Sequence, residues 1–245
     1  MRIKEKITDI DYGKSKQFFK NRAGKFREDN PYSVTMYQDN NEALVRERNR
    51  LEIEKLLPLL SLDKNSRVLD IACGIGRWAD ALPDAIEEYC GIDFSGELIE
   101  IANSRNTKEN FSFLEGAANE TETVLKRNGK GRYNVVLMMG ILIYINDSDM
   151  ASILEQVIRS CEEHARICIR EPIGMAERLT LKEFFSDELK DNYNAIYRTR
   201  EELMDFFRET FLKEGFCVSE EGFLFEGDEL NNRKETIQYY YILER

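Results

Sequence analysis

Histidine is almost absent from this chain of 245 residues, which narrows the chemistry available to it. His164 is the only one, so a zinc site built on several histidines is not expected, and we expect no metal. It lies in the polar stretch Glu162-Glu-His164-Ala165, away from the side of the fold where a ligand is expected, which indicates a structural or surface role. A Gly-x-Ser-x-Gly nucleophile elbow is also absent.

Basic charge and long apolar runs are lacking as well. The 46 acidic residues outnumber the 35 basic ones, and no basic stripe offsets the net charge of −11. Such a field repels polyanions, so we expect neither nucleic acid nor an anionic membrane as a partner. No apolar run approaches the roughly 20 residues that span a bilayer. The charged stretch from Met1 to Asp11 does not have the pattern of a signal peptide.

Disulfides are not expected either. The five cysteines are odd in number and include no Cys-x-x-Cys pair, and most lie in apolar, strand-like runs where cysteine acts as a small hydrophobe. This indicates a reduced, cytoplasmic protein. The length and the 42% of hydrophobic residues fit one domain of α/β size with a small cap, as a monomer or a homodimer.

Predicted strands and helices alternate after residue 60. Strands are expected at 67–71, 88–92, 111–114, 133–139 and 165–169, and helices at 78–82, 97–103, 121–126 and from 147. A capping box at Thr199 and Glu202 begins a helix to about 213, and strands at 216–225 and 236–243 follow. The order predicts an α/β, Rossmann-like, doubly wound, mostly parallel seven-stranded sheet with an antiparallel C-terminal strand.

The first predicted strand runs into a glycine turn. An apolar run ends on Asp70, and Ala72 and Cys73 come directly before Gly74-Ile-Gly76. A strand, a glycine turn and a helix let a backbone approach a nucleotide-like ligand closely. Asp93 ends the next strand, where a carboxylate would meet a ribose. Gly74-Ile-Gly76-Arg-Trp-Ala79 also satisfies the pattern of NAD-binding domains, so both cofactors are considered.

The residues before the glycines distinguish the two patterns. An NAD fingerprint normally runs from the strand straight into the first glycine, whereas here Ala72 and Cys73 intervene between the strand and Gly74. Val68-Leu-Asp-Ile-Ala-Cys-Gly-Ile-Gly76 resembles motif I of the class I S-adenosylmethionine (SAM) methyltransferases, Val-Leu-Asp-x-Gly-x-Gly-x-Gly, with Ala72 in place of the first glycine. The two final strands also fit that family. The Asn/Asp-Pro-Pro-Tyr signature of its members that methylate amino groups of nucleic acids is missing.

The resemblance implies a set of cofactor contacts. Turn residues surround the methionyl part of SAM, the carboxylate of Asp93 accepts hydrogen bonds from both ribose hydroxyls, and Phe94 flanks the adenine. Alanines stand where the family often has an acid on the adenine amino group, so a backbone contact is expected there. The implied cofactor-binding residues are Asp70, Ala72, Gly74, Gly76, Asp93, Phe94, Ala117, Ala118, Met139, Gly140 and Tyr37.

Two segments lie outside the alternation. Residues 1–60 are expected to form an N-terminal helical cap, including a helix capped by Asn41 that runs to Leu57, while residues 61–245 form the SAM-binding domain with an inserted lid at about 172–198. The stretch from Asn30 to Tyr37 and the helix after it resemble small-molecule methyltransferases of bacterial surface-polysaccharide and secondary-metabolite pathways. Tyr37 and Arg46 become candidates for closing the pocket or contacting the cofactor carboxylate.

Catalysis in such enzymes rests on positioning and desolvation, because the methyl group is already activated. No histidine base is expected, and the catalytic candidates are Glu171, Tyr144 and Tyr197. Arginines in segments expected around the pocket are predicted to bind an anionic acceptor, because arginine holds phosphate or carboxylate in a bidentate manner. These substrate-binding candidates are Arg170, Arg198 and Arg233, whereas Arg200 fits an exposed helix position.

The sequence therefore predicts a SAM-dependent methyltransferase that acts on the oxygen of a small, anionic metabolite or sugar. Two alternatives remain open from the sequence: an NAD-dependent Rossmann oxidoreductase, and a non-catalytic SAM-binding partner module.

Overall fold

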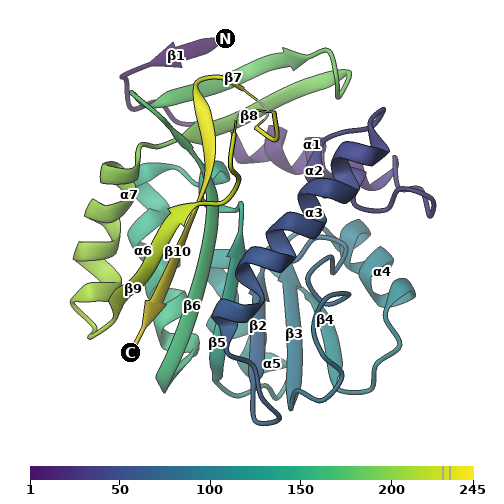
Figure 1. Ribbon diagram of the computed structural model, residues 1–245, viewed down its shortest axis with the longest axis vertical. Coiled ribbons are helices and arrows are strands. Elements are labelled where there is room, and N and C mark those ends of the chain that lie inside the picture. Colours follow the sequence, from purple (N-terminus) through teal and green to yellow (C-terminus); the bar gives the residue numbers. More distant parts are fainter. Residues whose placement is uncertain (228, 232) are drawn as a thin grey trace.

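A seven-stranded sheet forms the body of the protein, seen in a computed structural model that describes residues 1–227, 229–231 and 233–245 (Figure 1). The strand order is β4-β3-β2-β5-β6-β10-β9. Strands β2 to β6 are mutually parallel, and β10 runs antiparallel to both β6 and β9. This confirms the predicted fold class. The bounds are β2 Arg67–Ile71, β3 Glu88–Asp93, β4 Phe111–Glu115, β5 Tyr133–Met139, β6 Cys161–Gly174, β9 Cys217–Phe223 and β10 Thr236–Glu244.

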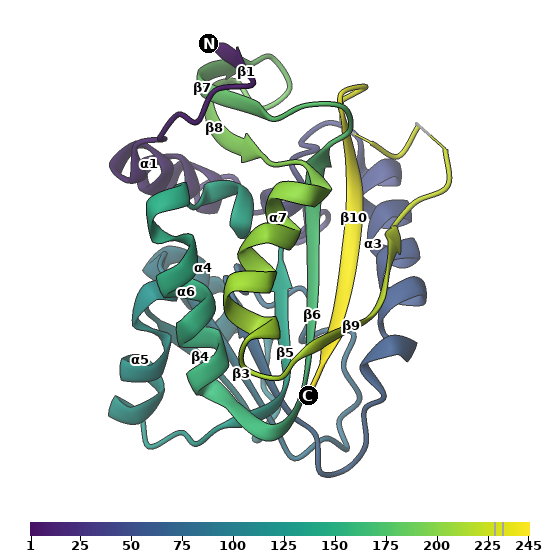
Figure 2. The same ribbon diagram turned by 90° about the vertical axis from the view of Figure 1, so that its left-hand side faces the viewer.

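Helices cover both faces of this sheet, and α3 lies on the face opposite to α6 and α7 (Figure 2). Strand β5 is apolar because both of its faces are buried: Val136 and Met138 join one core cluster, while Val135 and Leu137 join the other. The helix bounds are α3 Glu42–Leu56, α4 Gly96–Arg105, α5 Thr121–Arg127, α6 Asp147–Ser160 and α7 Arg200–Phe207.

The chain reverses its direction of winding beside β2. It adds β3 and β4 on one side of β2, and then β5 and β6 on the other. The connections after β2 and β5 therefore leave the sheet in opposite directions and open a crevice at the carboxyl ends of the strands. That switch point is where doubly wound sheets bind their ligands.

A second, three-stranded sheet lies over this end, at the top of Figure 1. Its order is β1-β7-β8, with β1 Arg2–Lys4, β7 Leu179–Ser186 and β8 Asp191–Tyr197. The inserted segment after β6 is thus a β-hairpin, which we call the lid hairpin. The first sixty residues also hold α1 (Tyr12–Ala23) and α2 (Ser33–Met36). They are not wholly helical as expected, because β1 pairs with the edge of β7.

Two local predictions were wrong or incomplete. The helix expected at 78–82 is a series of turns, because Pro83 follows at once and leaves too few residues for a stable helix. Strand β6 begins at Cys161, four residues earlier than predicted, and continues to Gly174 in pairing with β10. The capping box at Thr199 is present as predicted, and a π-helical turn, Arg208–Leu212, follows α7.

Candidate active site

A cavity of about 480 Å³ opens at the carboxyl ends of the parallel strands, below the lid hairpin. Its wall comes from the ends of β2, β3, β5 and β6, from α3, from the residues around α1 and α2, from β8 and from the loop before β10. Most of the lining is apolar or aromatic, with a few polar side chains between. That composition and size are typical of a small-molecule site.

The glycine turn forms one side of this cavity. Ala72, Gly74 and Gly76 all have left-handed backbones, with φ of 62°, 56° and 75°. A Cβ at Gly74 would lie 2.8 Å from Cγ2 of Thr35, so glycine lets α2 close directly over the turn. The amides of Ala72 and Cys73 donate to the carbonyl of Ile92, at 2.7 and 3.1 Å, which joins the turn to β3.

Asp93 faces the glycine turn from the end of β3. Its two carboxylate oxygens accept one backbone hydrogen bond each, from Gly74 and from Ser95, both at 2.9 Å. An ionised carboxylate has about four acceptor positions, so two remain for a ligand in the cavity. This donor set fits the two hydroxyls of a ribose. Burial raises the pKa of Asp93 to about 6.

The raised pKa of Asp93 gives a pH prediction. Ionised Asp93 can accept from both ribose hydroxyls and protonated Asp93 cannot, so affinity for S-adenosylhomocysteine (SAH) should fall as the pH drops through about 6. The ligand-free protein should respond in the opposite sense. Burial also raises the pKa of Asp70 and of Glu171 to about 7, so the folded state binds more protons than the unfolded state and gains stability as the pH falls from about 7.

Calorimetric titration with SAH and thermal unfolding of the ligand-free protein, both between about pH 7.5 and about pH 5, measure the two effects. We expect weaker SAH binding together with a higher melting temperature at the acidic end. A melting temperature that falls steadily over this interval, or SAH affinity that rises, would contradict the assignment of these three buried carboxyl groups.

Most of the predicted cofactor residues line the cavity. The lining includes Ala72, Gly74, Asp93, Phe94, Ala117, Ala118, Met139, Gly140 and Tyr37. Two do not, and this corrects the sequence interpretation. Asp70 is buried behind the turn, where its carboxylate accepts the Tyr89 hydroxyl at 2.8 Å. A Cβ at Gly76 would lie 2.7 Å from Phe113, so Gly76 packs against β4. Both residues shape the turn from outside the cavity.

Arg48, which the sequence analysis missed, takes the place expected of Arg46. Arg46 is exposed on α3 and pairs with Glu42. The side chain of Arg48 lines the cavity, is only 5% exposed and has no hydrogen-bond or ion-pair partner among the described residues. Burial alone lowers the pKa of Arg48. The spacing of Val45, Arg48 and Glu52 marks one buried helix face and was the available signal.

A buried cluster of charges lies one turn further along α3. Glu52 accepts hydrogen bonds from Arg77 and from the Trp78 indole, and its other oxygen lies 3.2 Å from Nε of Arg170. Burial would raise the pKa of Glu52, but Arg170 and Arg77 hold it below its ordinary value. Arg170 lines the cavity as predicted, and Gly140 makes room for it, since a Cβ there would lie 2.9 Å from the guanidinium.

Four tyrosine hydroxyls meet at the wall of the cavity. The Tyr144 hydroxyl donates to Tyr37 at 2.8 Å and lies 3.0 Å from that of Tyr193, which in turn accepts from Tyr197 at 3.3 Å. The predicted residues Tyr37, Tyr144 and Tyr197 are thus brought together, with Tyr193 as a fourth member. Burial raises the pKa of Tyr37 and Tyr193 to about 12 and also raises the pKa of Tyr144 and Tyr197 well above the ordinary value, so all four are neutral donors rather than bases.

Glu171 and Arg198 do not line this cavity, which corrects their predicted catalytic and substrate roles. Glu171 accepts from the amides of Leu142 and Ile143, at 2.8 and 3.3 Å. Arg198 donates to the carbonyls of Leu142 and Ile145, at 2.8 and 2.6 Å. The two side chains therefore fix the turn that carries Tyr144, because they satisfy both its donors and its acceptors.

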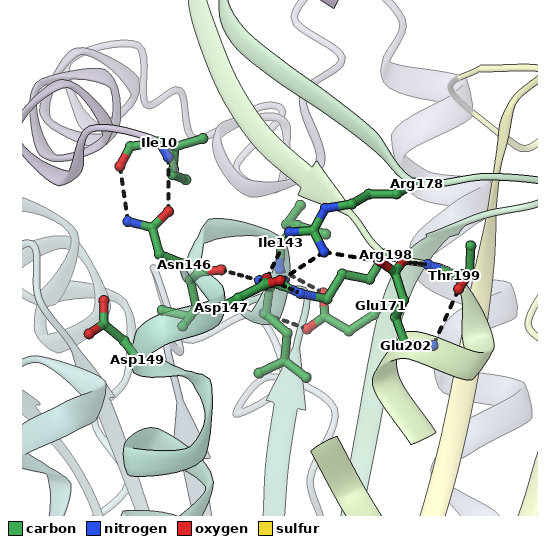
Figure 3. A network of polar contacts seen from close by, with 12 residues as sticks. Ile10, Ile143, Asn146, Asp147, Asp149, Glu171, Arg178, Arg198, Thr199 and Glu202 are labelled. Atoms are coloured by element: carbon green, nitrogen blue, oxygen red, sulfur yellow. Dashed lines mark hydrogen bonds and ion pairs between the residues drawn. The ribbon is translucent and has the colours of Figure 1, made fainter. Parts of the chain in front are cut away.

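One carboxylate fastens both ends of the lid hairpin (Figure 3). Arg178 precedes β7 and Arg198 follows β8, and both guanidinium groups bind Asp147 at the start of α6. Arg178 also reaches Glu202 at 3.1 Å. The pKa of Asp147 is lowered: burial opposes this, but Arg178 and Arg198 outweigh it. The stems of the lid hairpin are therefore anchored to the body of the domain.

Replacing Asp147 by alanine should destabilise the protein by about 3 kcal/mol, because it leaves two largely buried guanidinium groups without their shared partner. Urea unfolding measures the change. Asp205→Ala is the matched control, since Asp205 is 67% exposed and pairs with the exposed Arg208, and its effect should stay within about 0.5 kcal/mol. If Asp147→Ala, like the control, changes the free energy of unfolding by no more than about 0.5 kcal/mol, the anchor contributes nothing to stability.

The fold is Rossmann-like, and its cavity at the switch point suits a nucleoside cofactor. A family model described as "Methyltransferase domain" matches residues 43–218, from α3 through the cavity and the lid hairpin to β9. This chain belongs to that methyltransferase family, and it is an enzyme that uses SAM as its cofactor. The alternatives of an NAD oxidoreductase and of a non-catalytic module are thereby set aside.

Curated relatives match over a limited stretch. Demethylmenaquinone methyltransferase of Bacillus licheniformis is 30% identical over 82 residues, which are 32% of this chain and 34% of the relative. The enzyme of the same name from Staphylococcus aureus (strain Mu50) is 28% identical over 88 residues, 34% of this chain and 36% of the relative. The matches thus span about a third of the length of these relatives.

Solved structures match over nearly the whole chain. Phosphoethanolamine N-methyltransferase 1 of Haemonchus contortus, in complex with phosphoethanolamine and SAH, has a TM-score of 0.69 at 17% identity and covers 94% of this chain and 48% of that one. A SAM-dependent methyltransferase of Leishmania major has a TM-score of 0.64 at 14% identity, covering 93% and 83%. At these identities the comparison establishes the fold.

Proposed function

We propose that this chain transfers the methyl group of SAM to an oxygen atom of a small, anionic acceptor. The observation that carries the proposal is the single cavity that combines Asp93, with two free acceptor positions, and the cavity-lining guanidinium groups of Arg48, Arg170 and Arg233. Carboxylates suit the hydroxyls of a ribose, and arginines suit carboxylate or phosphate.

The residues present fit the cofactor at two points. Asp93 would hold the ribose hydroxyls beside the glycine turn, with Phe94 next to the adenine. Arg48 would bind the carboxylate of the methionine part, because a buried guanidinium without a partner is costly until an anion pairs with it. SAM supplies a methyl group on a positively charged sulfur. The protein contributes a lid hairpin that excludes water and a wall that aligns the acceptor with that methyl group.

Several observations support a small acceptor. The cavity lies between the sheet and the lid hairpin, whose anchored stems restrict access to it. The named relatives act on demethylmenaquinone or phosphoethanolamine, both small molecules. We further propose a role like that of the enzymes of bacterial polysaccharide and secondary-metabolite pathways, as a monomer or homodimer.

The place of action is proposed from the thiols. All five cysteines are free, and four of them are buried, which supports a reducing cytoplasm. In the part of the chain that the structure describes, no helix combines the length and the apolar character needed to cross a membrane.

A methyl-transfer assay with labelled SAM tests the proposed function. We incubate the protein with the small-molecule fraction of a bacterial extract and follow the label after chromatography. Label in a small-molecule methyl ester, which base releases, or in a methyl ether, which base leaves intact, supports transfer to oxygen. Label only in macromolecules, or on nitrogen, would overturn the acceptor class. The Asp93→Ala variant, which should not bind SAM, controls for contaminating enzymes.

A further inference from the structure

A chain of hydrogen bonds joins the C-terminal loop to the N-terminal segment across the lid hairpin. Arg233 donates from Nη1 to the Tyr197 hydroxyl at 3.1 Å, and the chain continues through Tyr193 and Tyr144 to Tyr37. All five residues line the cavity, and the guanidinium of Arg233 also lies over the rings of Tyr193 and Tyr197.

The hydrogen bonds of this chain are donated in one direction, from Arg233 toward Tyr37. Arginine has donors only, so the Tyr197 oxygen must accept from Arg233, and its proton goes to Tyr193. Because Tyr144 gives its proton to Tyr37, Tyr193 must in turn donate to Tyr144. The chain therefore ends at the hydroxyl proton of Tyr37, for which the structure gives no acceptor among the described residues.

Tyr37, which the sequence resemblance assigned to the cofactor, is held where this last proton can meet the acceptor instead. The residue lines the cavity directly after α2 and has a left-handed backbone with φ of 58°, which an aromatic residue rarely adopts. Strained positions of this kind persist where the surrounding structure holds them, and they concentrate at functional sites. Here the ring packs against Phe18 and Tyr193.

Among the described residues, no carboxylate of the cavity wall is left to remove a proton from a neutral acceptor. Glu52 lies between Arg77 and Arg170, the remaining acceptor positions of Asp93 are assigned to the ribose, and Asp149 accepts the Tyr12 hydroxyl at 2.5 Å. The four tyrosines are neutral donors. Arg48 is assigned to the cofactor carboxylate and Arg170 pairs with Glu52, so Arg233 is the arginine of the cavity wall that repels an ammonium group and attracts an anionic acceptor.

We infer that the reacting oxygen of the acceptor is acidic, a carboxylate or a phenolic or enolic hydroxyl, and that it reacts as an anion that accepts the Tyr37 hydrogen bond. The inference rests on the proposed function and deepens it, because it excludes simple alcohols and amines. A carboxylate enters already ionised, and a phenol or enol releases its proton to solvent on binding. A lone pair of that oxygen then forms the new bond to the methyl carbon, while the carbon–sulfur bond breaks and its electron pair stays on sulfur.

Three probes of the same size test this acceptor class on the SAH-saturated protein: benzoate, benzyl alcohol and benzylamine, titrated by calorimetry. We expect benzoate to bind at millimolar concentration and the other two at least about tenfold more weakly, the discrimination that one charge-assisted hydrogen bond provides. Benzylamine or benzyl alcohol binding as well as benzoate, or benzoate failing to bind at millimolar concentration, would overturn the inference.

Variants of the chain test the role of Tyr37. Tyr37→Phe should weaken benzoate by about tenfold while leaving SAH affinity within about twofold, and Tyr197→Phe, which interrupts the chain, should weaken benzoate less. Tyr240→Phe is the matched control, because its hydroxyl binds Glu220 away from the cavity, and it should change neither. Unaltered benzoate affinity in Tyr37→Phe, or an equal loss of SAH, would contradict the assignment. Absence of SAH binding by the unaltered protein would instead overturn the proposed function.

Discussion

The Asp93→Ala variant is expected to bind SAH at least about 100-fold more weakly than the unaltered protein. The carboxylate has two acceptor positions left over after Gly74 and Ser95, and each charge-assisted hydrogen bond to a ribose hydroxyl contributes about 1.5–3 kcal/mol. Two such bonds together correspond to a factor of about 100 or more in affinity. Isothermal titration calorimetry with SAH measures the loss.

Two further measurements make this result specific to the ribose. Methylthioadenosine carries the same ribose without the amino acid, so Asp93→Ala should lose it as strongly as it loses SAH. Asp84→Ala is the control, since Asp84 is exposed and forms an ion pair with Lys108. Retained SAH affinity in a folded Asp93→Ala protein would show that the ribose lies elsewhere.

The Arg48→Gln variant is expected to separate the two halves of the cofactor. Its affinity for SAH should fall by about 10-fold to 100-fold, because a buried guanidinium–carboxylate pair is lost, whereas methylthioadenosine should bind as before. Arg46→Gln, on the exposed side of the same helix, should bind both ligands normally. Calorimetry with the two ligands on the two variants completes the comparison.

Stability distinguishes a binding role of Arg48 from a structural one. Without a ligand, Arg48 is a buried charge with no partner in the described structure, so replacing it should leave the melting temperature unchanged or raise it. A lowered melting temperature with unaltered SAH affinity would mean that Arg48 supports the fold and does not bind the cofactor.

Much of the sheet could be predicted because its strands are short, apolar and separated by turn residues. Strand β5, from Tyr133 to Met139, is buried on both faces and reads as a continuous apolar run. The glycine turn could also be predicted, since left-handed backbones such as those at Gly74 and Gly76 favour glycine. Ala72 is the exception, and its φ of 62° shows that the turn tolerates one strained alanine.

The site was harder to predict because it depends on tertiary contacts. Glu171 follows β6 at the expected mouth, but two backbone amides from a distant turn capture its carboxylate. Arg198 is likewise taken up by Asp147 and two carbonyls. Arg46 and Arg48 differ by only two positions on one helix, yet one is solvated and the other lines the cavity. The way α3 packs on the domain decides which of the two arginines is buried.

The most direct test of the central claim is a calorimetric titration of the purified protein with SAH, and in parallel with NADH. The claim is that the cavity between the glycine turn, Asp93 and Arg48 holds the cofactor. We predict one SAH site per chain with micromolar affinity, lost in Asp93→Ala, and no binding of NADH. Binding of NADH in place of SAH, or SAH binding that survives both Asp93→Ala and Arg48→Gln, would contradict the account.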